Sequence, residues 1–202
     1  GERDISFEEN TSEEILLITT PHDRESFQSL LGDGSGFGIN IQYAVQPRPE
    51  GLAQAFIIAE KFLDGAASSL ILGDNIFFGH GLPEVLATAN KKDVGATIFG
   101  YHVNDPERYG VVGFDKNGKV NSIQEKPETP PSAYAVTGLY FLDETAPDRA
   151  KRIKPSKRGE LEITCLLESY LLENVLNVER LGRGFAWLDT GTHDSLISAN
   201  NF

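Results

Sequence analysis

Short apolar runs, each bounded by small or polar residues, recur along the 202-residue chain. Runs of strand length lie at residues 15–18, 39–43, 68–72, 96–103, 134–142, 175–181 and 185–188. Apolar residues at helical spacing predict helices near residues 27–31, 52–62, 82–90, 144–153, 160–173 and 195–202. Strands that alternate with helices predict an α/β fold with a Rossmann-like, mostly parallel sheet flanked by helices.

The pattern changes after residue 105. Residues 109–115 and 119–123 flank Lys116-Asn117-Gly118, and an Asn-Gly pair between two apolar runs is typical of a hairpin turn. Residues 134–142 predict one more strand of this antiparallel patch. We interpret residues 105–142 as a lid over the ligand edge of the sheet, inside a single domain that covers residues 1–202 and is incomplete at both ends.

Two of the predicted strands stop at an acid. Residues 68–72 lead into Gly73 and Asp74, and residues 185–188 are followed directly by Asp189. Ligands of α/β sheets gather at the carboxyl ends of strands, and two carboxylates from separate strand ends are a plausible cage for one hard divalent cation. The alternative is that each Asp only caps the helix that follows.

Two glycine-containing segments are candidate ligand loops. Residues 32–38 are rich in glycine, but they follow a helix and lead into a strand, whereas a phosphate loop follows a strand and opens a helix. We therefore expect a flexible connection there, which argues against a nicotinamide-dependent oxidoreductase. The segment from Gln46 to Gly51 contains two prolines and is predicted to be a stiff turn before a helix.

Composition limits the partners. The formal net charge of −12 disfavours nonspecific attraction to nucleic acid or to an anionic membrane, so a phosphate ligand needs a local cluster of cations or a metal. No apolar stretch reaches the roughly 18 residues that a spanning helix needs. A lone Cys165 cannot form an internal disulfide, which fits a cytoplasmic protein, and its apolar neighbours predict a small buried side chain.

Charged pairs supply such local cations. Glu125 and Lys126 end a predicted lid strand and project to opposite faces if that strand is regular. A carboxylate can accept sugar hydroxyls, and an ammonium can meet a phosphate. Lys157 and Arg158 precede a helix whose first turn carries two acids, which is a good helix start with an anion clamp as an alternative. Isolated charges of this kind are more often solvated surface.

In order along the chain, these segments resemble the glucose-1-phosphate thymidylyltransferases, a family of sugar nucleotidyltransferases. The resemblance covers residues 15–202 and rests on seven segments: Gln-Pro-x-Pro-x-Gly-Leu-Ala-Gln-Ala from Gln46, Leu-Gly-Asp-Asn at 72–75, Asp-Pro-Glu-Arg-Tyr-Gly-Val-Val at 105–112, Glu-Lys-Pro at 125–127, Ala-Val-Thr-Gly-Leu-Tyr at 135–140, Arg-Gly-Glu-Leu-Glu-Ile-Thr at 158–164 and Trp-Leu-Asp-Thr-Gly-Thr at 187–192.

The resemblance implies an enzyme of dTDP-sugar biosynthesis that forms dTDP-glucose and pyrophosphate from dTTP and glucose 1-phosphate with Mg²⁺. It implies catalytic roles for Asp74, Asp189 and Lys126, with both acids as metal ligands. It also implies a homo-oligomer, a tetramer in the family. The implied nucleotide contacts are Gln46, Gly51, Leu52 and Asp74, and the implied sugar-phosphate contacts are Tyr109, Gly110, Glu125, Lys126, Val136, Arg158 and Trp187.

The chain departs from the family pattern at both ends. The family's first strand, with its Gly-rich loop, an Arg and a following Lys, has no counterpart in the polar residues 1–14, and the C-terminal helices after Phe202 are not in the sequence. We expect part of a longer chain or a damaged copy. The alternative function is a non-catalytic module that binds sugar phosphates or sugar nucleotides through the lid.

Overall fold

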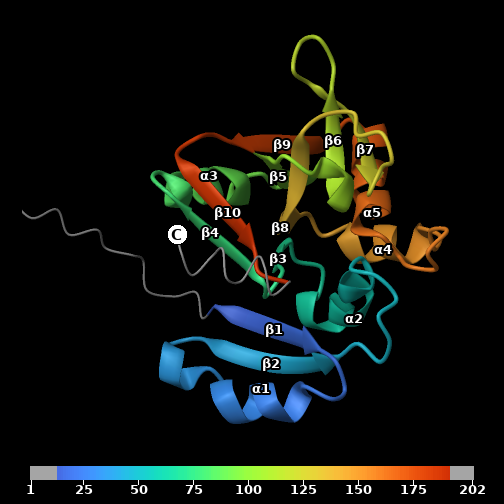
Figure 1. The fold of residues 1–202 in the computed structure, drawn as a ribbon. Coiled ribbons are helices and arrows are strands. Elements are labelled where there is room, and N and C mark those ends of the chain that lie inside the picture. The colour runs from blue at the N-terminus through green and yellow to red at the C-terminus, as the bar shows by residue number, and fades with distance from the viewer. Residues whose placement is uncertain (1–12, 192–202) are drawn as a thin grey trace, which may run out of the picture. The chain divides into compact units, whose positions relative to one another are not determined.

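The structure is a computed structural model that describes residues 13–191, shown in Figure 1. The predicted last helix, residues 195–202, lies outside the described residues. The chain divides into two compact units, Gly1–Glu50 and Gly51–Phe202. No helix in the described part of the chain is long and apolar enough to cross a membrane.

The first unit is a strand-helix-strand arrangement. Strand β1 (Glu14–Thr19) pairs in parallel with β2 (Asn40–Val45), and helix α1 (Arg24–Leu31) lies between them in sequence. The glycine-rich segment forms a short 3₁₀ helix (Ser35–Phe37) between left-handed Gly34 and Gly38, and it leads into β2 as expected for a connection. The expected burial of residues 15–18 is wrong, because Ile15 is 39% exposed and the other three are only half-buried.

The main sheet of the second unit has six strands. They are β3 (Ser68–Ile71), β5 (Ala96–His102), β6 (Gly110–Phe114), β7 (Val120–Glu125), β8 (Tyr134–Leu142) and β9 (Leu176–Leu181). Strand β8 is antiparallel to β3, β5 and β6, β7 is antiparallel to β6, and β9 is parallel to β5. The predicted common direction is thus confirmed for β3, β5 and β9, although most neighbours pair antiparallel because β8 lies between β3 and β5. The predicted hairpin is β6–β7, with Gly118 left-handed in its turn.

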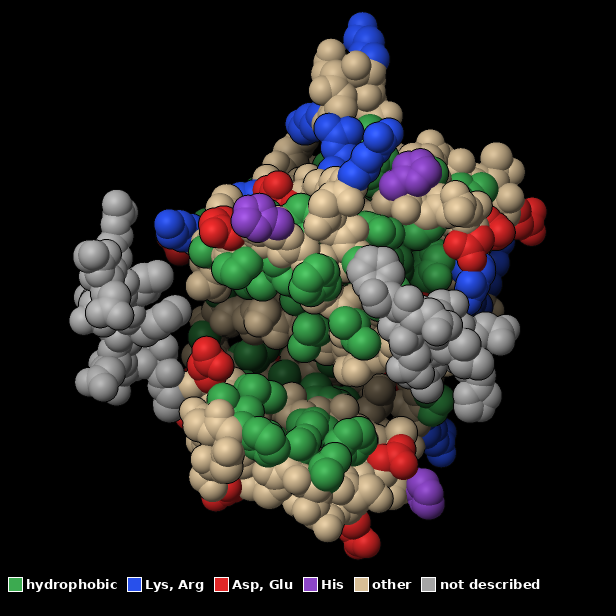
Figure 2. All heavy atoms as spheres, turned by 60° about the vertical axis from the view of Figure 1, so that its left-hand side comes forward, with side chains coloured by type: hydrophobic (Ala, Val, Ile, Leu, Met, Phe, Trp, Pro, Cys, Tyr) green, Lys and Arg blue, Asp and Glu red, His purple; other side chains and the backbone are tan. Residues whose placement is uncertain are grey.

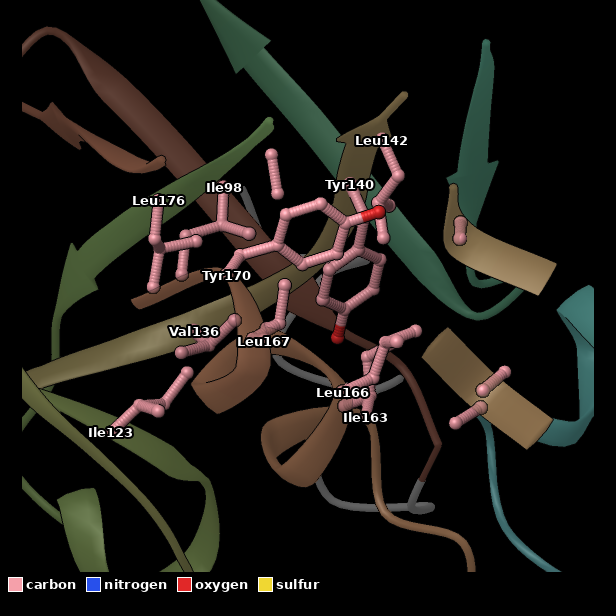
Figure 3. Close-up of a cluster of buried hydrophobic side chains, with 14 of the residues drawn as sticks. Ile98, Ile123, Val136, Tyr140, Leu142, Ile163, Leu166, Leu167, Tyr170 and Leu176 are labelled. Atoms are coloured by element: carbon pink, nitrogen blue, oxygen red, sulfur yellow. The ribbon is translucent and has the colours of Figure 1, made fainter. Parts of the chain in front are cut away.

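Helices cover one face of this sheet, and the main core lies beneath them. These helices are α2 (Gln54–Leu63), α4 (Ala146–Arg152) and α5 (Ile163–Leu172). Figure 3 shows Leu166, Leu167 and Tyr170 of α5 packed against strand residues such as Ile98 and Val136. The buried Tyr170 hydroxyl donates to Asp143 Oδ1 over 3.0 Å, so its polar atom is satisfied inside the core. Helix α5 begins three residues later than predicted, because Glu162 is extended with ψ at 140°.

A second cluster lies around helix α3 (Leu82–Asn90), where Ala89 packs with Phe99, Leu139 and Leu181. Two short strands contribute to it, β4 (Asn75–Gly79) through Phe77 and β10 (Phe185–Asp189) through Phe185. These strands pair antiparallel as a two-stranded ribbon, with Asp189 opposite Asn75. Strand β4 was not predicted, because its only partner in the described chain lies more than a hundred residues away in sequence.

Cations gather locally despite the acidic composition. Figure 2 shows Lys and Arg side chains around the projecting end of the β6–β7 hairpin, whose turn carries Lys116 and Lys119. Nearby, the Arg180 guanidinium lies 5.2 Å from the centroid of the Phe114 ring, a cation–π distance. Charge on this chain is therefore unevenly distributed, as a local phosphate site requires.

Candidate functional site

A cavity of about 620 Å³ opens within the second unit, a volume typical of small-molecule sites. Ten of the twelve predicted site residues line it, and they come from four strands and from the loops between elements. These ten are Leu52, Asp74, Tyr109, Gly110, Glu125, Lys126, Val136, Arg158, Trp187 and Asp189.

The two predicted acids meet at one end of this cavity. A methyl group added to Gly191 would lie 2.8 Å from Asp74 Oδ2 and 3.2 Å from Asp189 Oδ1. Together, these two distances place the oxygens at most 6.0 Å apart, so both carboxylates lie at the same end of the cavity. The predicted convergence of Asp74 and Asp189 is therefore seen in the geometry.

The element that positions Asp74 differs from the predicted one. Asp74 follows β3 by three residues and directly precedes β4, so it is held by the β4–β10 ribbon rather than by the tip of a parallel strand. The backbone N–H and the hydroxyl of Thr190 both donate to the Asp74 carbonyl oxygen, over 2.8 and 2.7 Å. These two hydrogen bonds hold Thr190, the residue after Asp189, next to Asp74.

Asn75 links the acid end to the wall of the cavity, and it was not singled out as a site residue. Its Nδ2 donates to Asp74 Oδ1 over 2.8 Å, and its Oδ1 accepts from Trp187 Nε1 over 2.5 Å. Trp187 is 8% exposed and meets Tyr109 edge to face at 5.3 Å between ring centroids. The only sequence signal for Asn75 was its place in the Leu-Gly-Asp-Asn segment.

The other end of the cavity holds an arginine among three carboxylates. Arg158 Nη2 lies 3.1 Å from Glu160 Oε1, and Arg158 Nη1 lies 3.6 Å from both Glu125 Oε1 and Glu162 Oε1. Burial, and after it the negative charge of Glu162, raise the pKa of the Glu125 carboxyl, while the hydroxyl of Thr164, which donates to Glu125 Oε2 over 3.2 Å, opposes this shift. Glu162 and Thr164 are further cavity residues that the sequence did not single out, since their segment was interpreted as a helix start.

Glu125 and Lys126 both line the cavity, contrary to the opposite faces expected of a regular strand. Strand β7 ends at Glu125, and Lys126 has a φ of 40°, in the left-handed region that a residue with a side chain seldom adopts. Its backbone N–H donates to the Tyr109 carbonyl over 3.0 Å, which helps to hold this conformation. Such strain often marks a functional site.

Gln46 and Gly51 do not line this cavity. Gln46 belongs to the first unit, and its role in nucleotide binding stays a prediction. Gly51 has a φ of 104°, and an added methyl group would lie 2.3 Å from the Leu161 carbonyl oxygen. Close backbone packing therefore requires glycine at this position, and its nucleotide contact also stays a prediction.

The acid end fits a hard divalent cation. In the described part of the chain, neither Asp74 nor Asp189 forms an ion pair, and no cluster of three or more His, Cys, Asp or Glu side chains is placed to hold a metal. Mg²⁺ commonly takes one or two protein carboxylates and fills its other positions with water and substrate phosphates. Two converging aspartates match that donor set, whereas they would not suffice for an all-protein metal cage.

Cys165 is unsuited to nucleophilic catalysis. It is half-buried, and burial followed by the charges of Glu168, Glu162 and Glu125 raises the pKa of its thiol. A thiol with a raised pKa is seldom ionised near neutral pH. The burial predicted for Cys165 is thus only partial.

Comparison with known proteins identifies the family. Residues 6–202 match the family model described as Nucleotidyl transferase. The chain belongs to this family. The prediction of a nucleotidyltransferase is thereby confirmed.

Two curated relatives are named glucose-1-phosphate thymidylyltransferase. The one from Xanthomonas campestris pv. campestris is 62% identical over 94% of this chain, and the one from Neisseria gonorrhoeae is 59% identical over the same share. The chain spans 64% and 66% of their lengths. It thus matches about two thirds of each nucleotidyl transferase.

Solved structures agree on the fold. A crystal structure of a candidate glucose-1-phosphate thymidylyltransferase from Bacillus anthracis, in complex with sucrose, is 41% identical and superposes with a TM-score of 0.82, covering 93% of this chain and 74% of that one. A UDP-glucose pyrophosphorylase complexed with UDP-glucose superposes with a TM-score of 0.78 at 21% identity, covering 94% and 80% of the two chains. The second likeness concerns the fold alone.

Proposed function

We propose that the protein carrying this chain is a glucose-1-phosphate thymidylyltransferase, which joins dTTP and glucose 1-phosphate to give dTDP-glucose and pyrophosphate. The observation that carries the proposal is the cavity, with two aspartates at one end that form no ion pair within residues 13–191 and an Arg-carboxylate cluster at the other. The two curated relatives of that name support the choice of substrates.

The sugar phosphate would occupy the lid side of the cavity. Glu125 offers carboxylate oxygens to sugar hydroxyls, while Tyr109, Gly110, Val136 and Trp187 form the surrounding wall. Lys126 and Arg158 would bind the phosphate and reduce the repulsion between two anionic reactants. Leu52 lies on the same cavity and, with Gln46 and Gly51, is assigned to the nucleotide.

The reaction is a displacement at phosphorus. A phosphate oxygen of glucose 1-phosphate attacks the α-phosphorus of dTTP, the bond from that phosphorus to the bridging oxygen breaks, and pyrophosphate leaves with the electron pair. Such a transfer depends mainly on alignment and on neutralising oxygen charge. Mg²⁺ held by Asp74 and Asp189 would supply part of that neutralisation, and Lys126 would hold the attacking phosphate in line.

Compartment and assembly belong to the same proposal. We place the enzyme in the cytoplasm, where a lone Cys165 stays reduced, and we expect a homo-oligomer of four subunits. Sedimentation equilibrium of the full-length protein measures the number of subunits directly.

The test is pyrophosphate release by the full-length natural protein with dTTP, glucose 1-phosphate and Mg²⁺. We expect turnover that falls at least a hundredfold in an Asp74→Ala variant, because one lost electrostatic contact costs about 10²–10³ in rate. UTP in place of dTTP tests the base, since one methyl group is worth about 1–3 kcal/mol. Binding of dTDP-glucose by calorimetry without turnover would instead indicate a non-catalytic module.

A further inference from the structure

Asn75 is bonded to three different parts of the second unit. Its Oδ1 accepts from the indole N–H of Trp187 on β10, over 2.5 Å, and from the backbone N–H of Gly138 on β8, over 2.9 Å. Its Nδ2 donates to Asp74 Oδ1 over 2.8 Å. One amide therefore joins the cavity wall, the main sheet and a carboxylate of the acid end.

The chemistry of these partners fixes the amide in a single orientation. The Trp187 and Gly138 groups can only donate a hydrogen bond, and an ionised Asp74 carboxylate can only accept one. A flipped amide would set N–H against two donors and oxygen against a carboxylate. The site is also tight, because a methyl group added to Gly138 would lie 2.5 Å from Asn75 Oδ1.

The Asp74 carboxylate depends on this amide for its own orientation. The main chain of Asp74 is held through its carbonyl oxygen by Thr190, but that contact leaves the side-chain torsions free. Asn75 fixes Oδ1, and this leaves Oδ2 on the side of Asp189 Oδ1, as their shared proximity to Gly191 indicates. A turned Asn75 amide would therefore release the oxygen that faces the second acid.

We propose that Asn75 is a positioning residue that links the Trp187 wall of the cavity to the Asp74 carboxylate and so sets the affinity of the acid pair for a divalent cation. The assignment of the Trp187 wall to the sugar phosphate rests on the proposed function, whereas the link between Trp187, Asn75 and Asp74 rests on the three hydrogen bonds. Groups that orient metal-binding carboxylates typically contribute about 10- to 100-fold in metal affinity.

A double-mutant cycle tests the link, with Mn²⁺ binding to the full-length protein measured by electron paramagnetic resonance without nucleotide. We expect Asn75→Ala to weaken Mn²⁺ binding about tenfold or more. Trp187→Phe keeps an aromatic ring in the wall but removes the donor to Asn75 Oδ1, and we expect about a threefold loss. The double variant should bind Mn²⁺ no more weakly than Asn75→Ala alone.

The matched control is Asn177→Ala on β9, a half-buried asparagine whose side chain, within the described residues, donates only to the Ala96 carbonyl, over 3.4 Å. It should bind Mn²⁺ like the wild type, with circular dichroism confirming that each variant folds. If Asn75→Ala does not fold, the loss in Trp187→Phe still tests the link, because within residues 13–191 the indole N–H of Trp187 bonds to Asn75 and not to Asp74.

Three results would overturn the proposal: wild-type protein that binds no Mn²⁺, Trp187→Phe with wild-type affinity, or losses that simply multiply in the double variant. Multiplying losses would mean that Asn75 and Trp187 act independently, as a merely structural role predicts. The readout does not depend on turnover. Absence of thymidylyltransferase activity would therefore reject the proposed function and leave the cation link to be judged separately.

Discussion

The two ends of the cavity treat their carboxylates differently. At the acid end, Asp74 and Asp189 converge with no ion pair to either in the described chain, and the groups that hold them are neutral donors such as the Asn75 amide and the Gly191 backbone N–H. At the lid end, three glutamates surround Arg158, and the side chain of Glu162 is only 6% exposed. In the described chain, the acid end holds two carboxylates without a paired cation, whereas the other end holds one arginine among three carboxylates.

This difference indicates what each end can bind. Two carboxylates at short distance repel each other, and a bound cation removes this repulsion. A carboxylate pair without its own cation therefore attracts an external one. A cluster that contains its own arginine instead presents the arginine's remaining donors to an anion and the carboxylate oxygens to hydroxyl groups. The following substitutions test this contrast.

Asp189→Asn should have the largest effect. It keeps an acceptor for the Gly191 N–H but removes half of the charge of the acid pair, so we expect turnover of dTTP and glucose 1-phosphate to fall about 10²–10³-fold. Steady-state pyrophosphate release measures this loss. Asp148→Asn, an exposed acid on α4, is the control and should retain full activity. Turnover above a tenth of the wild-type value in Asp189→Asn would contradict the role of the pair.

Arg158→Gln should have the next largest effect and should act on binding. It leaves Glu125, Glu160 and Glu162 without their shared cation, so the KM for glucose 1-phosphate should rise about tenfold to a hundredfold, as expected for a lost charged hydrogen bond. Initial rates against sugar phosphate concentration measure it. Arg152→Gln on α4 is the control. An unchanged KM would show that the cluster does not face the phosphate.

Glu162→Gln should shift the pH dependence of the KM for glucose 1-phosphate. Burial and the Glu162 charge raise the pKa of Glu125, so Glu125 gains its proton at a higher pH than an ordinary glutamate, and the KM for glucose 1-phosphate should rise as pH falls through that value. Removing the Glu162 charge lowers this pKa and should move the rise in KM to lower pH. The KM measured from about pH 4 to 7 tests the direction, and a shift to higher pH would contradict it.

Thr164→Val should have the smallest effect and the opposite direction. The hydroxyl of Thr164 stabilises ionised Glu125, so its removal raises the pKa of Glu125 and should move the same rise in KM to higher pH. At neutral pH we expect only about a threefold increase in KM, the size of one ordinary hydrogen bond. Thr164→Val and Glu162→Gln shift the pKa of Glu125 in opposite directions, so the double variant should show a pH dependence of KM close to that of the wild type.

Local sequence patterns were sufficient for most elements. Apolar runs and the Asn117-Gly118 turn predicted β5, the β6–β7 hairpin and β8. For β8, both predicted bounds were correct to the residue. Ten of the residues grouped in the sequence line one cavity, and they were grouped because several segments resembled one family at once. This grouping depends on many short segments that match the family in the same order along the chain. Glu125 or Arg158 alone would have been interpreted as solvated surface.

Features set by distant contacts were not predictable. Strand β4 exists through pairing with β10, and Asn75 gains its role only when Trp187 comes opposite its amide. Lys126 turns toward the cavity because one backbone angle leaves the strand conformation, which breaks the alternation that placed it on the other face. Periodicity describes a regular element and carries no information on where that regularity stops.

Trp187 is the only tryptophan among these 202 residues, and it lies in the cavity wall with its N–H bonded and its ring against Tyr109. Indole emission responds to the polarity and hydrogen bonding around the ring, so light emitted by this chain originates at the place where ligands are expected to arrive. The chain thus carries an intrinsic optical reporter of occupancy, and ligand titrations on it need no added dye.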